Sequence, residues 1–331
     1  MTALPYPEFA TEDAYRARFT AVTFWQPYAR EVCLRHGIAA HDLQPGMWGT
    51  NPVYMAGASG KRVFIKLFTA LFGGRTSAPM ELEVYRVLAH APDIPAPHLL
   101  ATGELFPDHP DWPWPYLILS AIPGLSLGEV RDRVSWVDVL ATARALGPIV
   151  RRMHALPISS PALHASRQAF LPFLCAQRET CVAQHRTRQS LPPHLVDQLD
   201  DYLPDLAHIA NLLDKSGLCV GHNDLNQDHV LGEFDAAARW RMTGIIDFGD
   251  AGVCDRLYDL TVIHCGLFLG DKRLLAAFLE AYGVDKDLRD QFVYRAMCYT
   301  LLHRFHLLEH LDSASTDITS LAAMADKLWR V

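Results

Sequence analysis

The feature that most constrains the fold of this chain is a change of residue pattern at Pro123-Gly124. Before it, segments rich in β-branched and aromatic residues predict strands: MWGTNPVYM and KRVFIKLF as a hairpin around a turn at 57–60, then HLLATGEL and YLILSAI. After it, apolar residues recur at helical spacing, first from about 135 to 156. This order predicts an α+β fold with two lobes, a small β-rich N-terminal lobe (1–121) and a larger helical C-terminal lobe (122–331).

Helices are expected in both lobes. In the first lobe, residues 12–36 read as one or two amphipathic helices, and Pro79 fits the first turn of a helix that continues through MELEVYRVLAHA. In the second lobe, the helical pattern covers 165–188, 192–214 and most of 256–329. The short apolar segments LCVGH, VLGEF and MTGIIDF predict strands between these helices.

Composition narrows the class of protein. The chain has 331 residues, enough for two lobes around a cleft, and half of them are apolar, as in soluble globular proteins. No apolar run reaches the roughly 18 residues of a membrane span, and the N-terminus is acidic where a signal peptide would be basic, so a cytoplasmic protein is expected. The net charge of −7 and the lack of a basic stripe argue against nucleic-acid binding. Seven scattered cysteines without a CxxC pair argue against a disulfide framework and a cysteine zinc site.

Two polar loops, each following an apolar strand, carry the most informative residues. The first is HNDLNQDH (222–229), which contains Asp224, and the second is GIIDFGD, which contains Asp247. A loop at a strand end can aim a carboxylate and leave it able to react. One of these carboxylates suits a base for a hydroxyl group, and the other suits a ligand for a hard divalent cation.

A third signal is Lys66, at the centre of the apolar segment VFIKLF. A lysine in such a strand is costly unless its ammonium group meets an anion, either a carboxylate or a nucleotide phosphate. Glu81 is the better carboxylate candidate on the helix that follows, and Glu83 is the alternative. The competing interpretation is a surface lysine on an edge strand.

Strand lysine, helix glutamate, H-x-D loop and D-F-G motif, in this order, form the signature set of protein kinases. The chain has no G-x-G-x-x-G or A-P-E motif, and HNDLNQDH instead resembles the H-G-D-L-x-x-x-N loop of the aminoglycoside phosphotransferase family. GIIDFGDAGVCDRLYDL is similar to that family's I-I-D-F-x-x-A-x-x-G-D-P-x-Y-D-L stretch, and TNPV, IKLF and WPWPYL resemble segments of its hygromycin B branch. The resemblance spans nearly the whole chain and implies a protein-kinase-like fold.

The resemblance also implies a role for each motif residue. Asp224 would be the catalytic base that orients the acceptor hydroxyl and takes its proton. Asp247 would hold Mg²⁺ against the nucleotide phosphates, and Lys66 would contact the α- and β-phosphates of ATP or GTP. His222 resembles a structural histidine of the catalytic loop, and Asp255 resembles an aspartate that supports this loop by hydrogen bonds.

His229 departs from the family pattern, because Asn usually stands there as a second metal ligand. Three interpretations are open for the second ligand: His229 binds the metal in a variant site, Asn226 or Asp228 takes its place, or the site depends on Asp247 alone. Imidazole prefers softer ions than Mg²⁺. His229 as an ordinary loop residue is a fourth possibility.

The remaining nucleotide contacts are expected in two segments. The inter-lobe stretch 117–122, with Ser120 and Ile122, is expected to pair with the base through backbone groups. Thr50 and Asn51 lie in the turn where the resemblance places the loop that covers the phosphates, and their polar groups are candidates for phosphate contacts.

The leading hypothesis is an ATP- or GTP-dependent phosphotransferase that modifies a hydroxyl of a small cationic molecule, an aminoglycoside such as hygromycin B, and so gives antibiotic resistance. Acidic side chains in the C-terminal helical region would attract such an acceptor. The alternatives are a kinase of another metabolite or antibiotic, a nucleotide-binding pseudokinase, and a serine hydrolase, since GLSLG around Ser126 formally matches G-x-S-x-G. No nucleic-acid or membrane partner is expected, and the protein is expected to be a monomer or weak dimer.

Overall fold

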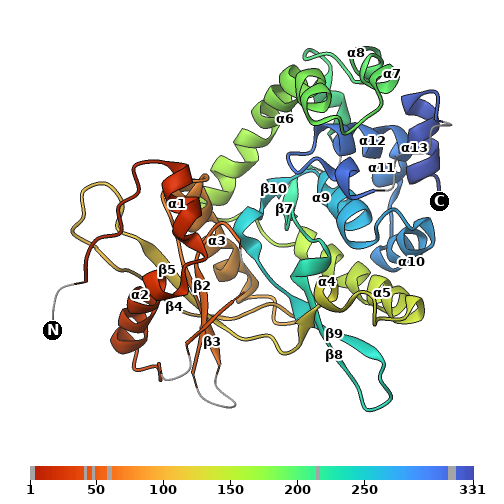
Figure 1. Cartoon of the computed structure of the whole chain (residues 1–331). Helices are drawn as coiled ribbons and strands as arrows, with labels where there is room; N and C mark the ends of the chain where they lie inside the picture. Colours follow the sequence, from red (N-terminus) through yellow and green to blue (C-terminus); the bar gives the residue numbers. More distant parts are fainter. Residues whose placement is uncertain (1–3, 41–42, 47–48, 58–61, 214–216, 312–317) are drawn as a thin grey trace. The chain divides into compact units, whose positions relative to one another are not determined.

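The computed structural model describes all residues except 1–3, 41–42, 47–48, 58–61, 214–216 and 312–317. The chain forms two compact units. The first unit comprises residues 1–90 and 96–122, and the second comprises 91–95 and 123–331. The first is built around a sheet and the second is mainly helical, so the predicted α+β class is confirmed (Figure 1).

An antiparallel sheet is the centre of the first unit. Its five strands, among the described residues, have the order β1-β2-β3-β5-β4. They are β1 (Gln44–Pro45), β2 (Val53–Ala56), β3 (Val63–Leu67), β4 (Leu99–Glu104) and β5 (Pro115–Ser120). The β2–β3 hairpin was predicted from the sequence, although most of its expected turn at 57–60 falls outside the described residues. Strand β3 is the central strand, with β2 on one side and β5 on the other.

The helices in the described part of this unit are α1 (Glu12–Phe19), α2 (Val22–Arg35) and α3 (Gly74–Leu88). The expectation that Pro79 lies in the first turn of α3 is wrong, because the helix begins five residues earlier. Gly73 has a left-handed backbone (φ 75°), and a Cβ on Gly74 would lie 1.8 Å from the carbonyl oxygen of Thr69. The glycine pair therefore allows the chain to turn into the helix. This stretch has no apolar periodicity, so the sequence pattern did not predict that the helix begins here.

The second unit has two small antiparallel sheets among its described residues. In one, β7 (Cys219–Gly221) pairs with β10 (Gly252–Cys254). In the other, β8 (Val230–Phe234) lies between β6 (Leu125–Ser126) and β9 (Trp240–Ile245). The HNDLNQDH loop connects β7 to β8, and the DFGD segment connects β9 to β10.

Helices form the rest of this unit (Figure 1). The longer ones are α5 (Trp136–His154), α6 (Pro161–Arg188), α9 (Arg256–Val262), α10 (Lys272–Tyr282), α12 (Phe292–Leu302) and α13 (Leu321–Trp329). Short turns are α4 (Leu127–Val130), α11 (Lys286–Arg289), η2 (Gln227–His229), η3 (Phe248–Asp250), the π-helix η4 (Ile263–Leu267) and η5 (Leu307–His310). Ser135 caps α5 through its side chain, which accepts a hydrogen bond from the backbone of Asp138.

The continuous helix expected at 192–214 is not observed. The chain instead forms three single turns, α7 (Pro193–Val196), α8 (Leu199–Tyr202) and η1 (Ile209–Leu212). Leu203 is extended (ψ 145°) directly before Pro204, and proline disfavours helical geometry in the residue before it. Most leucine, isoleucine and valine side chains of this stretch are thus still buried, but the helix that their spacing predicted is broken into short turns.

All seven cysteines lie in described residues and are free thiols, as the sequence predicted. In the described part of the chain, no helix combines the length and apolarity needed to cross a membrane.

Candidate active site

The two polar loops of the second unit are tied together by His222. Its Nε2 donates a hydrogen bond to the backbone oxygen of Ile246 at 3.0 Å, directly before Asp247. The ring is fully buried and lies 4.8 Å from the ring of Phe248. Burial lowers the pKa of His222 and keeps the imidazole neutral. This arrangement supports a scaffolding role.

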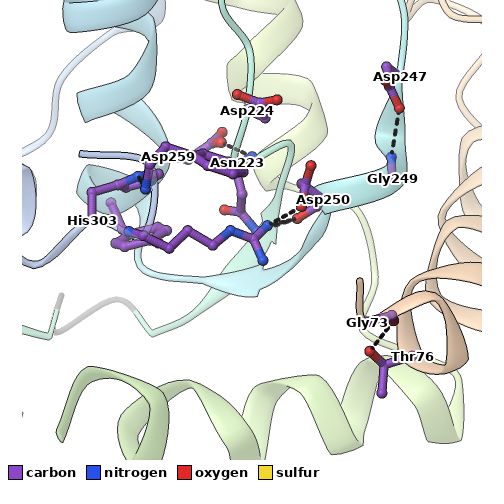
Figure 2. A network of polar contacts seen from close by, with 12 residues as sticks. Gly73, Thr76, Asn223, Asp224, Asp247, Gly249, Asp250, Asp259 and His303 are labelled. Carbon is purple, nitrogen blue, oxygen red and sulfur yellow. Dashed lines mark hydrogen bonds and ion pairs between the residues drawn. The ribbon is translucent and has the colours of Figure 1, made fainter. Parts of the chain in front are cut away.

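Asn223 shapes the chain just before Asp224. Its backbone is left-handed (φ 63°), a conformation that Asn tolerates better than most residues. Its backbone N–H donates to Asp259 Oδ1 at 2.5 Å, and its side-chain Nδ2 donates to the backbone oxygen of Asp250 at 3.2 Å (Figure 2). Two independent contacts therefore fix the peptide that carries Asp224.

A buried ion pair holds Asp259 in place. The distance between His154 Nε2 and Asp259 Oδ2 is 2.8 Å, and His154 Nδ1 lies 2.8 Å from the hydroxyl of Tyr282. Burial alone would lower the pKa of His154, but its polar neighbours, Asp259 among them, raise it well above its ordinary value. Burial would likewise raise the pKa of Asp259, and its hydrogen bonds and the His154 charge lower it instead. Both groups are therefore charged at neutral pH.

Asp255 contributes to the loop through helix α9. Its side chain caps the helix by accepting a hydrogen bond from the backbone of Leu257 at 2.8 Å. Arg295 Nη2 lies 3.5 Å from Asp255 Oδ2. Helix α9 carries Asp259, which accepts the hydrogen bond from the backbone of Asn223 in the HNDLNQDH loop. The sequence resemblance suggested Asp255 as a support of this loop, and the structure adds a direct hydrogen bond from the loop backbone to Asp259, one turn later.

Asp224 lies in the loop after β7, with its side chain about one-fifth exposed. Burial raises its pKa to about 7, and the negative charges of Asp250 and Asp247 act in the same direction against the opposing effect of His229. Asn226 Nδ2 donates to Asp224 Oδ1 at 3.1 Å, and Asn226 Oδ1 accepts from the backbone of Asp228 at 2.8 Å. A carboxyl group with a pKa near neutrality suits general-base chemistry.

Asp247 and His229 stand beside Asp224. Asp247 has a left-handed backbone (φ 62°), and its Oδ1 accepts a hydrogen bond from the backbone of Gly249 at 3.3 Å (Figure 2). The distance from His229 Nε2 to Asp247 Oδ2 is 3.7 Å, and His229 Nδ1 lies 2.6 Å from the backbone oxygen of Asp224. A carboxylate and an imidazole nitrogen thus lie within reach of one cation.

Two alternative interpretations of the sequence lose support here: Asp228 as a metal ligand and Ser126 as a nucleophile. A Cβ on Gly128 would lie 1.8 Å from Asp228 Oδ1, so the Asp228 carboxylate packs against the start of α4. Ser126 is buried and caps α4, with its hydroxyl accepting from the backbone of Glu129 in a capping box. A serine nucleophile needs an exposed hydroxyl on a strained turn, and Ser126 has neither property.

In the first unit, Lys66 and Glu81 form a buried ion pair. Lys66 Nζ lies 2.8 Å from Glu81 Oε2 and 3.1 Å from Oε1. Lys66 pairs with Val53 on one side and Leu117 on the other, so the edge-strand interpretation is wrong. Glu83 instead forms an exposed pair with Arg86.

The other predicted nucleotide contacts have structural partners within the first unit. Asn51 Oδ1 accepts a hydrogen bond from the backbone of Thr69 at 3.2 Å, and the backbone oxygen of Thr50 accepts from Tyr15 at 2.6 Å. The Ser120 hydroxyl accepts from the backbone of His98 at 2.8 Å, and the Ser120 N–H donates to the His98 oxygen at 2.9 Å. Ile122 is half-buried at the end of this unit. The backbone N–H of Ser120 is thus already engaged in a hydrogen bond with His98, just before β4.

A cavity of about 190 Å³ in the second unit borders Asn223. Its walls combine aromatic rings from α6 and α9 with an ion pair between Arg304 Nη2 and Asp250 Oδ1 at 2.8 Å. The rings belong to Phe170, Phe173 and Tyr258. The sequence did not single out this combination, since its residues come from four separate segments between Ser166 and Arg304. By contrast, two of the acidic side chains in the C-terminal helical region, Asp271 and Asp285, are helix caps that pair with arginines.

Comparison with known proteins identifies the family. Residues 48–297 match the sequence model of the Phosphotransferase enzyme family. This chain belongs to that family. The chain is 26% identical to an aminoglycoside 3'-phosphotransferase from Streptomyces fradiae over 233 residues, which cover 65% of this chain and 75% of that protein. It is 25% identical to the lysine-specific demethylase JMJ21 of Arabidopsis thaliana in an alignment of 407 positions, covering 87% of this chain and 43% of the plant protein. The chain thus spans less than half the length of that relative.

The fold of the chain also matches solved structures. The GDP and kanamycin complex of APH(2")-IIIa superposes with a TM-score of 0.62 at 19% identity, covering 91% of this chain and 96% of that one. The kinase-like α+β fold and the assignment to a phosphotransferase family, both predicted from the sequence, are confirmed.

Sequence reasoning missed His154 and the direct contact of Asp259 with the loop. His154 lies on α5, and 105 positions separate it from Asp259. No local motif marks it, because its importance comes from a buried contact between distant segments.

Proposed function

We propose that this phosphotransferase moves the γ-phosphate of ATP or GTP to a hydroxyl group of an aminoglycoside antibiotic of the hygromycin B type, and so confers resistance. The observation that carries the proposal is the arrangement of Asp224, Asp247 and His229 on two tied loops, with the pKa of Asp224 raised to about 7. The kanamycin complex of a structural neighbour supports an aminoglycoside as acceptor.

Asp224 is the residue proposed to orient the acceptor hydroxyl and accept its proton as the phosphoryl group is transferred. Phosphoryl transfer needs positioning and charge neutralisation more than covalent help from the protein. The hydrogen bonds of Asn223 and Asn226 hold the Asp224 carboxylate in a defined orientation. His222 and the α9 cap Asp255 support this geometry without contacting the reacting atoms.

The donor set at Asp247 fits a divalent cation. Mg²⁺ is usually held by one or two carboxylates together with phosphate oxygens and water. Asp247 supplies a carboxylate, and His229 supplies a nitrogen 3.7 Å from it. When bound, the ion would neutralise charge on the nucleotide phosphates.

The N-terminal lobe, residues 1–121, is proposed to bind the nucleotide. Lys66, held by Glu81, would contact the α- and β-phosphates, and backbone groups of 117–122, including Ile122, would pair with the base. Thr50 and Asn51 remain candidates for phosphate contacts, through the hydroxyl of Thr50 and the amide nitrogen of Asn51. GDP in the structural neighbour is consistent with GTP as donor, and ATP is the alternative.

The C-terminal lobe, residues 122–331, is proposed to bind the acceptor in the cavity beside Asn223. A sugar ring can pack on Phe170, Phe173 and Tyr258, beside the ion pair of Arg304 and Asp250. The net charge of −7 favours a cationic acceptor at long range. A cytoplasmic location and a monomer or weak dimer also remain predictions, and size-exclusion chromatography tests the latter.

The test is turnover with purified protein, Mg²⁺, ATP or GTP, and a panel of aminoglycosides that includes hygromycin B. We expect nucleoside diphosphate release and a mass gain of one phosphate on the acceptor. Asp224→Asn should lower kcat by about 10²- to 10⁴-fold, because it removes the base and keeps the shape. The exposed Asp201→Asn is the matched control.

The other possible results of this turnover assay would each favour an alternative function. Phosphorylation of a different hydroxylated metabolite or antibiotic would keep the chemistry and replace the acceptor. Nucleotide binding without turnover of any acceptor in a broad mass-spectrometric screen would favour a pseudokinase.

A further inference from the structure

The protonation pattern of the His229 ring follows from one short contact. His229 Nδ1 lies 2.6 Å from the backbone oxygen of Asp224. A carbonyl oxygen only accepts hydrogen bonds, so Nδ1 must carry a proton. In the neutral imidazole the second nitrogen, Nε2, then bears a lone pair. Nine-tenths of the residue is buried, which holds the ring in this orientation.

That lone pair faces a carboxylate. The distance from His229 Nε2 to Asp247 Oδ2 is 3.7 Å. Metal–nitrogen and metal–oxygen bonds of about 2.0–2.2 Å add to more than this separation, so one ion can contact both atoms. Their separation therefore allows the two atoms to act as a bidentate pair toward one cation.

The contact with Asp224 is also what a metal-binding histidine requires. Such a histidine usually donates its other ring N–H to a carboxylate or a backbone carbonyl, which sets its tautomer and orientation. Here the carbonyl belongs to the proposed catalytic base. The ring thus links the cation site to the peptide of Asp224.

We propose that His229 binds the divalent cation through Nε2 together with Asp247, and that this nitrogen ligand shifts the site's preference from Mg²⁺ toward Mn²⁺. The inference rests on the proposed function in taking Asp247 as the metal-holding carboxylate. Imidazole binds Mn²⁺ and later transition metals more readily than Mg²⁺, which selects oxygen ligands. An amide oxygen at position 229 would favour Mg²⁺ instead.

The competing arrangement is an imidazolium. A doubly protonated His229 would form ion pairs with Asp247 and with Asp224 Oδ2, which lies 3.6 Å from Nδ1. Its positive charge would take the place of the cation beside Asp247, and its protonated Nε2 could not bind a metal. The two arrangements differ in whether nitrogen enters the coordination sphere.

The experiment is pulsed electron paramagnetic resonance of Mn²⁺ bound to the chelator-stripped full-length protein. We expect ¹⁴N modulation from a directly coordinated imidazole, and its replacement by a ¹⁵N pattern when histidine is labelled with ¹⁵N. His229→Asn should abolish the nitrogen modulation and raise the Kd for Mn²⁺ by about tenfold or more, with a smaller change for Mg²⁺. His208→Asn, which alters an exposed His–Asp pair, is the matched control and should retain the modulation.

Absence of nitrogen modulation in the wild-type protein, or its persistence in His229→Asn, would overturn the inference. The isotope label tests whether a histidine nitrogen coordinates Mn²⁺ in the wild-type protein. This result therefore does not depend on whether the His229→Asn variant folds. Phosphotransfer measured with Mg²⁺ on the same preparations separates the two proposals. Turnover without nitrogen coupling would overturn only the metal ligand, and nitrogen coupling without turnover would overturn only the function.

Discussion

Asp224 is buried enough that its carboxyl group holds a proton close to neutral pH. Burial raises its pKa to about 7, and the charge of Asp250 adds to the shift. We expect the Asp224 carboxyl carbon in metal-free protein to titrate near pH 7 in ¹³C NMR spectra. If Asp224 is the base, as proposed, it is protonated and inactive below this midpoint. Asp250→Asn should lower the midpoint, and an unchanged value would show that Asp250 has no influence.

His154 is a second residue whose environment determines its role. It forms a fully buried ion pair with Asp259, which in turn holds the backbone of Asn223. Removing one partner of such a pair leaves an uncompensated buried charge, at a cost of about 3–5 kcal/mol. We expect His154→Ala to lower the free energy of unfolding in urea by this amount and to reduce kcat. His164→Ala, on the next helix, is the control and should be nearly neutral.

At the scale of elements, helix α3 depends on a close approach at its first residue. A Cβ on Gly74 would lie 1.8 Å from the Thr69 carbonyl oxygen, a backbone atom that cannot move alone. We expect Gly74→Ala to destabilise the protein by about 1–3 kcal/mol, despite the higher helix propensity of alanine. Thermal unfolding measures the effect. Gly49→Ala should be close to neutral, because no atom lies within 4 Å of its added Cβ.

The elements also show where local patterns suffice. The β2–β3 hairpin and helices α5 and α6 follow from alternation, helical spacing and capping residues, all of which are local. The start of α3 and the interrupted stretch at 192–214 do not, because the Thr69 contact and the extended residue before Pro204 act on backbone geometry. Apolar periodicity reports which side chains are buried, and it leaves helix continuity undetermined.

For the molecule as a whole, a buried histidine predicts sensitivity to acid. His264 Nε2 donates to the backbone oxygen of Leu328 at 3.0 Å, and burial lowers the pKa of this histidine to about 4. The unfolded chain, with a histidine pKa near 6.5, binds more protons between these values. This contribution to stability is present above pH 6.5 and is lost as the pH falls toward 4, by about 3 kcal/mol.

Urea unfolding at pH 7 and pH 5 measures this loss. We expect His264→Gln to be less stable than wild type at pH 7, and to lose less stability than wild type between the two pH values. An equal loss in both proteins would assign the acid sensitivity to other groups.

The sequence by itself determined the two-lobe α+β class, the family, and the candidates Lys66, Asp224 and Asp247. Each of these rests on residue order and spacing, which can be read directly from the sequence. Only the tertiary structure decided that His154 and Asp259 secure the HNDLNQDH loop and that His229 Nε2 lies 3.7 Å from Asp247 Oδ2. Burial, tautomer and contacts between distant segments arise when the chain packs, and no local pattern contains them.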